Sequence, residues 1–320
     1  MGSGKRSGAL SCARCRVGRL IRDDVPTTLL SVPTAVINVT FDPVLRLTET
    51  SSVRLETIGL AIVLFLGLLL AARIGSITPA IGPYVPAPGL RIDDLVFTVV
   101  GAVPGAIVGG RLGYVLDHLD YYRANPAAIL DPAQGGLSLT LAVPLGILTG
   151  GLIARLLGAP VGRWLHATAA PLLFVLAAGK LAGVLGATGQ GAPSDLPWAT
   201  TFEGPGPWGS LGVSIPSHPA QVYEALLVGG AIVMLAVVSR VEFIARRDGG
   251  AMFAALALWA VARFIVASTW RDPAVAGPLR MEQLLDIGVL VIAVLGLRER
   301  ARAPLVAPID KRLDAEARLA

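Results

Sequence analysis

Seven long apolar segments constrain this chain more than any other feature of its sequence. A helix needs about 20 apolar residues to cross a bilayer, and each segment is close to that length. Only 15% of the 320 residues are charged, whereas soluble domains carry roughly 25%. We therefore predict an all-α polytopic membrane protein with seven transmembrane helices. The segments are 57–75, 94–116, 137–157, 166–187, 219–239, 250–270 and 281–297.

The distribution of basic residues between these segments indicates an orientation. The loop 188–218 contains no Lys or Arg, whereas the chain after residue 297 is rich in both. Cytoplasmic loops carry the excess of Lys and Arg. We therefore expect 188–218 to form a small external head and the C-terminus to be cytoplasmic. The net charge of +5 then reflects cytoplasmic loops and not a nucleic-acid partner.

The parts of the chain outside these segments are predicted to form an arm and two tails. The N-terminal stretch is basic and has no long apolar core, and its Cys12 and Cys15 form a lone CxxC, which is a weak zinc signal. We predict no metal site there. The next stretch alternates weakly and suggests a strand pair. The predicted division is a disordered extension 1–36, an external N-terminal arm 37–56, a transmembrane domain 57–297 and a cytoplasmic tail 298–320.

Ionisable side chains interrupt four of the apolar segments. Arg111, Lys180, Glu224 and Arg263 each lie within one of them. At membrane depth an ionisable group is costly and normally lies toward the protein interior or a water-filled cavity, which makes each a functional-site candidate. Three of the four are cations. The sequence therefore predicts a cavity that binds an anion.

Each of these residues also has a structural interpretation. Arginine binds phosphate through two parallel hydrogen bonds, but Arg111 could equally snorkel to the interface or pair with a nearby aspartate. Arg263 needs a partner in the middle of its segment, and Glu224 or a bound anion are the candidates. Lys180 is a second candidate for phosphate binding, as a point charge.

Further polar residues lie at the starts of two apolar segments. His218 could act as a base near neutral pH or cap the helix that follows it. Gln221 lies three residues before Glu224, so both belong to one helix face. Gln283 and Asp286 have the same spacing, and they either close the same cavity or pair with a neighbouring arginine.

Several motifs, in the same order along residues 36–297, resemble those of the bacterial prolipoprotein diacylglyceryl transferases. GGRLGYVL (109–116) matches the family's arginine-containing motif almost letter for letter, and HPAQVYE (218–224) is similar to its HPSQLYE. The two motifs together are specific. Weaker matches are FDPV (41–44) with the following Arg54, GGLS (135–138), GKLAGVLGATGQG (179–191), ARFIVASTWRDP (262–273) and Gln283.

The resemblance implies a monomeric, seven-helix enzyme of the bacterial inner membrane, working without metal or cofactor. Such enzymes move the diacylglyceryl group of phosphatidylglycerol onto the lipobox cysteine thiol of a prolipoprotein signal peptide. Arg263, His218 and Glu224 would then be catalytic. The residues expected to bind the substrate or the lipid phosphate are Arg111, Lys180, Tyr114, Gln221, Gly191, Gln283 and Arg271.

Several motif positions depart from the family pattern. Thr140 replaces a histidine and cannot act as a base near neutral pH, and Lys180 replaces an arginine whose planar fork it cannot reproduce. Gly183, Thr188 and Ala267 replace an asparagine and two glutamates. Two alternatives therefore stand beside the transferase. One is a degenerate homologue that binds anionic lipid or signal peptide without turnover. The other is a small-molecule transporter, although no inverted repeat is evident.

Overall fold

The computed structural model describes residues 36–78, 90–131, 133–205, 215–241, 244 and 249–302, and these residues are mostly helical. The predicted extension 1–36, with Cys12 and Cys15, lies outside the described residues apart from Val36. The predicted tail 298–320 is described only as far as Arg302, where the last helix ends.

Within the described residues, six helices are long and apolar enough to cross a membrane: α1 (Leu55–Ile77), α2 (Ile92–Asp117), α4 (Leu139–Leu156), α5 (Val161–Val184), α6 (Ala220–Val238) and α8 (Gly250–Ala267). They coincide within a few residues with the first six predicted segments, which confirms the prediction for those six. The seventh segment is also helical, as α9 (Met281–Arg302). Its acidic start and basic end leave it more polar than the other six.

The connections hold short elements. A helix α3 (Leu119–Ala124) and a 3₁₀ turn η1 (Pro126–Leu130) follow α2. The described residues also form three two-stranded sheets, which the all-α prediction did not include. In these sheets β1 (Ile37–Thr40) is parallel to β4 (Thr200–Glu203), β2 (Val44–Arg46) is antiparallel to β3 (Ser52–Arg54), and β5 (Ala274–Ala276) is antiparallel to β6 (Leu279–Arg280).

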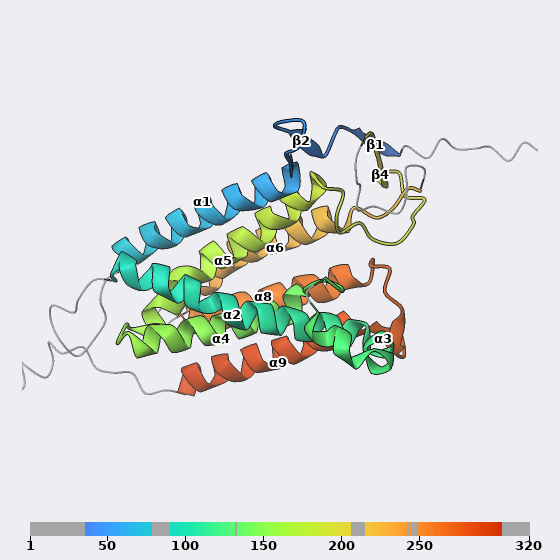
Figure 1. Cartoon of the computed structure of the whole chain (residues 1–320). Helices are drawn as coiled ribbons and strands as arrows, with labels where there is room; N and C mark the ends of the chain where they lie inside the picture. Colours follow the sequence, from blue (N-terminus) through green and yellow to red (C-terminus); the bar gives the residue numbers. More distant parts are fainter. Residues whose placement is uncertain are drawn as a thin grey trace, which may run out of the picture. The chain divides into compact units, whose positions relative to one another are not determined.

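The N-terminal arm contains the expected strand pair as the β2–β3 hairpin, which leads directly into α1. The first strand of the arm, β1, pairs instead with β4 of the loop 188–218 (Figure 1). Arm and loop therefore lie together at the end of the helices where α5 ends and α6 begins.

Glycine allows α2 and α4 to pack with their backbones in contact. A Cβ atom added at Gly105 would lie 2.3 Å from the carbonyl oxygen of Leu145, and one at Gly109 would lie 2.3 Å from that of Leu141. Small residues permit such close approach between membrane helices. Glycine at both positions therefore permits the close packing of α2 against α4.

We expect Gly109→Ala to destabilise the protein, because the added methyl group meets the rigid backbone of α4. Overpacking of this kind costs about 1–3 kcal/mol. Gly230→Ala in α6 is the matched control, since nothing lies within 4 Å of a Cβ at that position. Thermal unfolding of both variants in detergent checks the expectation. Equal midpoints for the two variants would contradict it.

The helix α8 is the most buried of the six apolar helices, since 67% of its 18 residues lie inside the protein. It packs against α5, α6 and α9 (Figure 1). Trp259 and a set of alanines fill its contacts with these neighbours. Arg263 follows Trp259 by one helical turn and is only 2% exposed. The partners of this buried guanidinium define the candidate site.

Candidate active site

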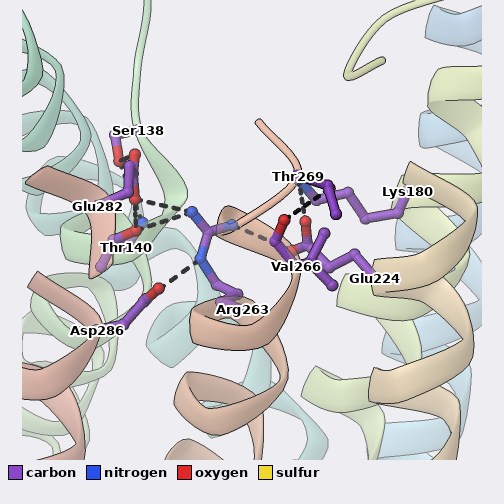
Figure 2. A network of polar contacts seen from close by, with 9 residues as sticks. All are labelled: Ser138, Thr140, Lys180, Glu224, Arg263, Val266, Thr269, Glu282 and Asp286. Carbon is purple, nitrogen blue, oxygen red and sulfur yellow. Dashed lines mark hydrogen bonds and ion pairs between the residues drawn. The ribbon is translucent and has the colours of Figure 1, made fainter. Parts of the chain in front are cut away.

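The guanidinium of Arg263 lies at the centre of a buried network contributed by five helices (Figure 2). Its Nη1 lies 3.1 Å from Oε1 of Glu224, and its Nη2 lies 2.9 Å from Oε2 of Glu282. Its Nε lies 3.5 Å from Oδ1 of Asp286. Arg263 pairs with Glu224 as expected, and two further carboxylates from the first turns of α9 complete its surroundings.

Glu224 bridges two cations. Its second oxygen, Oε2, lies 2.8 Å from Nζ of Lys180 in α5. The carboxylate is 1% exposed, whereas the lysine side chain retains 22% exposure. The ring of Trp270 lies beside both cations, 4.8 Å from the Arg263 guanidinium carbon and 5.9 Å from the lysine Nζ. Lys180 is thus the more accessible cation of the network.

Two hydroxyl groups at the start of α4 hold Glu282. Ser138 Oγ donates to Glu282 Oε1 at 2.6 Å, and Thr140 Oγ1 donates to Oε2. Thr140 Oγ1 also accepts from Arg263 Nη2 at 2.9 Å. Ser138 is the N-cap of α4, so this helix begins beside the Glu282 carboxylate. Thr140 lies between Arg263 and Glu282.

Carboxylates outnumber cations in the described part of this network, and the predicted excess of cations is therefore wrong here. Glu224, Glu282 and Asp286 surround the two cations. The carboxylates of α9 lie in the first turns of their helix. The sequence does not say which side of α9 packs against Arg263, because that depends on tertiary contacts.

A second group of polar atoms lies where the loop 188–218 meets α6. Nδ1 of His218 and Oε1 of Gln221 are buried and have no hydrogen-bond partner among the described residues. A buried polar group without a partner costs free energy. Gln221 lies on the same helix as Glu224, one turn before it. The two unpaired atoms are therefore candidates to bind a polar group of a ligand.

Gly191 permits the close packing of this loop against the end of α8. Its N–H donates to the carbonyl of His218 at 2.8 Å, and its carbonyl accepts from Arg271 Nε at 2.9 Å. A Cβ at this position would lie 2.4 Å from the carbonyl oxygen of Thr269. Glycine is required here for backbone approach. The expected lipid-binding roles of Gly191 and Arg271 remain predictions.

Comparison with known proteins places the chain in a family. A family described as prolipoprotein diacylglyceryl transferase matches residues 46–298. Two similar proteins are both named phosphatidylglycerol–prolipoprotein diacylglyceryl transferase. The one from Solidesulfovibrio magneticus is 33% identical over 276 residues, which cover 82% of this chain and 95% of that protein. The one from Geobacter sulfurreducens is 32% identical over 214 residues, which cover 64% and 77%.

This chain belongs to the prolipoprotein diacylglyceryl transferase family. The resemblance inferred from the motifs is thereby confirmed. The relatives carry a transferase name, which favours the transferase over the degenerate homologue and the transporter.

The arginine of the family-like GGRLGYVL motif, Arg111, lies outside the Arg263 network. Its Nε donates to the carbonyl of Ile129 at 2.7 Å, and its Nη2 donates to those of Ala128 and Asp131 at 2.6 and 2.9 Å. It thus caps the C-terminal end of η1, where helix carbonyls lack partners. The Arg111 guanidinium carbon also lies over the ring of Tyr122, 5.3 Å from its centroid. Its expected role in phosphate binding remains a prediction.

The other expected binding residues of the family member have structural contacts of their own. Tyr114 stacks on His118 with ring centroids 4.2 Å apart. Gln283 accepts a hydrogen bond from the backbone N–H of Arg280 and donates to the carbonyl of Phe264, tying the start of α9 to α8. Neither residue belongs to the Arg263 network, and their expected binding roles remain predictions.

Sequence reasoning missed Glu282, and it offered Arg280 as a partner for Asp286, which instead lies against Arg263. One signal was available for both. They lie in the first turns of the last apolar segment, and a carboxylate in an apolar segment requires a partner as much as an arginine does. Their position near the end of the segment, where a charge is ordinary, concealed this signal. Within this family member, the glutamate contacts Thr140, the position where the family pattern carries a histidine.

Proposed function

We propose that this chain transfers the diacylglyceryl group of phosphatidylglycerol to the lipobox cysteine thiol of a prolipoprotein. Family membership supports the reaction class, and the names of the relatives supply the two substrates. The observation that carries the proposal is the buried Arg263 network, which places two cations beside each other at one end of the helices. A lipid phosphate is the anion that such a pair suits.

The proposed topology places this network at the outer side of a bacterial cytoplasmic membrane. The loop 188–218 has no Lys or Arg, whereas the C-terminal end of α9 carries Arg298, Arg300 and Arg302. The positive-inside rule then puts the loop and the arm outside and the C-terminus in the cytoplasm. We take α9 to be a seventh span, since its two buried carboxylates pair with Arg263 and are tolerated for that reason. The protein is taken to work as a monomer.

In the proposed reaction, the thiol of the lipobox cysteine loses its proton to a base. The thiolate then attacks the glyceryl carbon that carries the phosphate ester. A carbon–sulfur bond forms, the carbon–oxygen bond breaks, and glycerol phosphate leaves with the electron pair. Negative charge grows on the leaving phosphate, so nearby cations stabilise the transition state more than the ground state.

Lys180 and Arg263 are the cations proposed for the leaving phosphate. Lys180 is the more exposed, so the headgroup reaches it first. Glu224 holds the two cations together through its two oxygens. Carboxylates already occupy the guanidinium of Arg263, so the incoming phosphate takes over contacts that Glu224 or Glu282 makes in the free protein.

Two residues are candidates for the base, and the structure favours Glu282. His218 has a buried ring nitrogen without a partner among the described residues. Glu282, however, is a carboxylate in contact with Thr140, where the family pattern places a histidine, and with Arg263. It therefore lies beside the groups proposed to bind the phosphate. A base must reach the proton that it removes, so this position favours Glu282.

The proposal is tested with purified full-length protein, dioleoyl-phosphatidylglycerol and a synthetic lipobox peptide. We expect a thioether-linked diacylglyceryl peptide by mass spectrometry, together with one equivalent of released glycerol phosphate. A peptide with serine in place of the cysteine, and phosphatidylcholine as the lipid, are the controls. Bound phosphatidylglycerol without any product would reject the transferase in favour of the degenerate homologue.

A further inference from the structure

A long apolar cavity runs between four helices on the other side of Thr140 from the α9 carboxylates. Its volume is about 380 Å³, which is within the range of small-molecule pockets. It is lined by residues of α1, α2, α4 and α5 and by Met252 of α8. Two hydroxyl side chains line it, Thr98 and Thr168, and the second donates to the backbone of its own helix. The cavity thus suits hydrocarbon.

The cavity extends along most of α4, which lies beside α2 in Figure 1. Its lining on this helix begins at Leu139 and continues to Ala154. Fifteen residues of helix rise about 22 Å. One leaflet of the hydrocarbon core is about 15 Å deep, half of roughly 30 Å. The cavity is therefore long enough to hold a fatty chain over the full depth of a leaflet.

One end of the cavity meets the polar network. Leu139 lines the cavity, and the next residue, Thr140, accepts from Arg263 and donates to Glu282. The opposite end is closed by Leu95 and Trp164, both almost completely buried. A polar network next to one end of an apolar cavity, with buried side chains at the other end, is the complement of one anionic headgroup with one attached chain.

The volume argues for a single chain over a peptide helix. A helix with side chains is about 10–12 Å wide, so a 22 Å length of it would occupy more than about 1,700 Å³. The cavity is smaller than that. Small residues of α4 keep it open, and a Cβ at Gly151 would meet only Val161 Cγ1, at 3.7 Å. That position has space for a larger side chain inside the cavity.

We propose that this cavity holds one fatty acyl chain of the lipid whose phosphate binds at Arg263, and that its closed end limits the length of that chain. The proposal rests on the proposed function for the identity of the lipid. Surrounding lipid is as apolar as the cavity wall, so the cavity adds selectivity by fit more than it adds affinity. A chain longer than the cavity must bend or leave its end outside.

The test introduces Gly151→Leu, which fills the deep half of the cavity. Purified protein is equilibrated with an equimolar mixture of dilauroyl- and dioleoyl-phosphatidylglycerol, and bound lipid is measured by native mass spectrometry. We expect the ratio of dioleoyl to dilauroyl lipid to fall by about tenfold, the discrimination typical of a filled hydrophobic pocket. Gly230→Leu on α6, with nothing within 4 Å of its Cβ, should leave the ratio unchanged.

A second variant tests the opposite direction. Val161→Ala enlarges the cavity at the same place, and it should raise the ratio toward the longer chain. An unchanged ratio in both cavity variants, or no binding of either lipid to the native protein, would overturn the proposal. The readout does not need turnover. A shifted ratio in a protein that forms no thioether product would reject the proposed function and keep the acyl-chain site.

Discussion

Arg263→Lys is expected to lower the rate of diacylglyceryl transfer by about 10²–10³-fold, the effect of losing one donor to a developing charge. Lysine keeps the positive charge but not the planar fork. A single ammonium group cannot reproduce the separate contacts of Arg263 with Glu224, Glu282 and Asp286. The rate is measured as thioether product from dioleoyl-phosphatidylglycerol and a lipobox peptide.

The same change also weakens a buried ion network, and breaking one buried pair costs about 3–5 kcal/mol. Thermal unfolding in detergent therefore accompanies the rate measurement. Arg298→Lys, at an exposed position of α9, is the matched control and should change neither quantity. Full activity of a stable Arg263→Lys protein would contradict the assignment of Arg263 to the phosphate.

Glu282→Gln is expected to lower the transfer rate by roughly 10²–10⁴-fold, the contribution of a general base. The amide is nearly the same size as the carboxylate, and its oxygen can still accept one of the two hydrogen bonds that Ser138 and Thr140 donate, but it cannot take up a proton. The rate is measured as thioether product from the same lipid and lipobox peptide as for Arg263→Lys.

His218→Gln separates the two candidates for the base. If Glu282 is the base, the histidine variant loses activity only modestly. The reverse pattern, with a large loss of rate in His218→Gln and a small one in Glu282→Gln, would assign the proton to His218. Both variants use the same substrates, and thermal unfolding shows whether either change has altered the fold.

The helices and the family were largely predictable from the sequence. Six apolar segments became the six apolar helices with shifts of a few residues at their ends, because length and hydropathy are local properties of a chain. Arg263 and Glu224 were each identified as ionisable groups in apolar surroundings, and their pairing followed from the scarcity of partners. Glu282 was not identified, since it lies close to a segment end, where a charge is ordinary.

The role of Arg111 shows a different limit. Its motif matches the family closely, yet its Nε and Nη2 contact the carbonyls at the end of η1. Nothing in the residues 109–116 predicts a 3₁₀ turn that ends beside them. A motif identifies a position in the chain, whereas the partners of a long side chain come from whichever segment packs next to it.

Apolar segments, motifs and ionisable residues were enough to predict a polytopic membrane protein of the prolipoprotein diacylglyceryl transferase family, with buried charges among its helices. Which charges pair with one another became clear from the packing of the helices. It brought Glu282 and Asp286 of α9 to Arg263 of α8, and it reversed the expected balance of charge in the network. The length and hydropathy of a helix are properties of one continuous segment, so they can be predicted from that segment alone. The rotation of one helix against another is set by packing between segments distant in sequence.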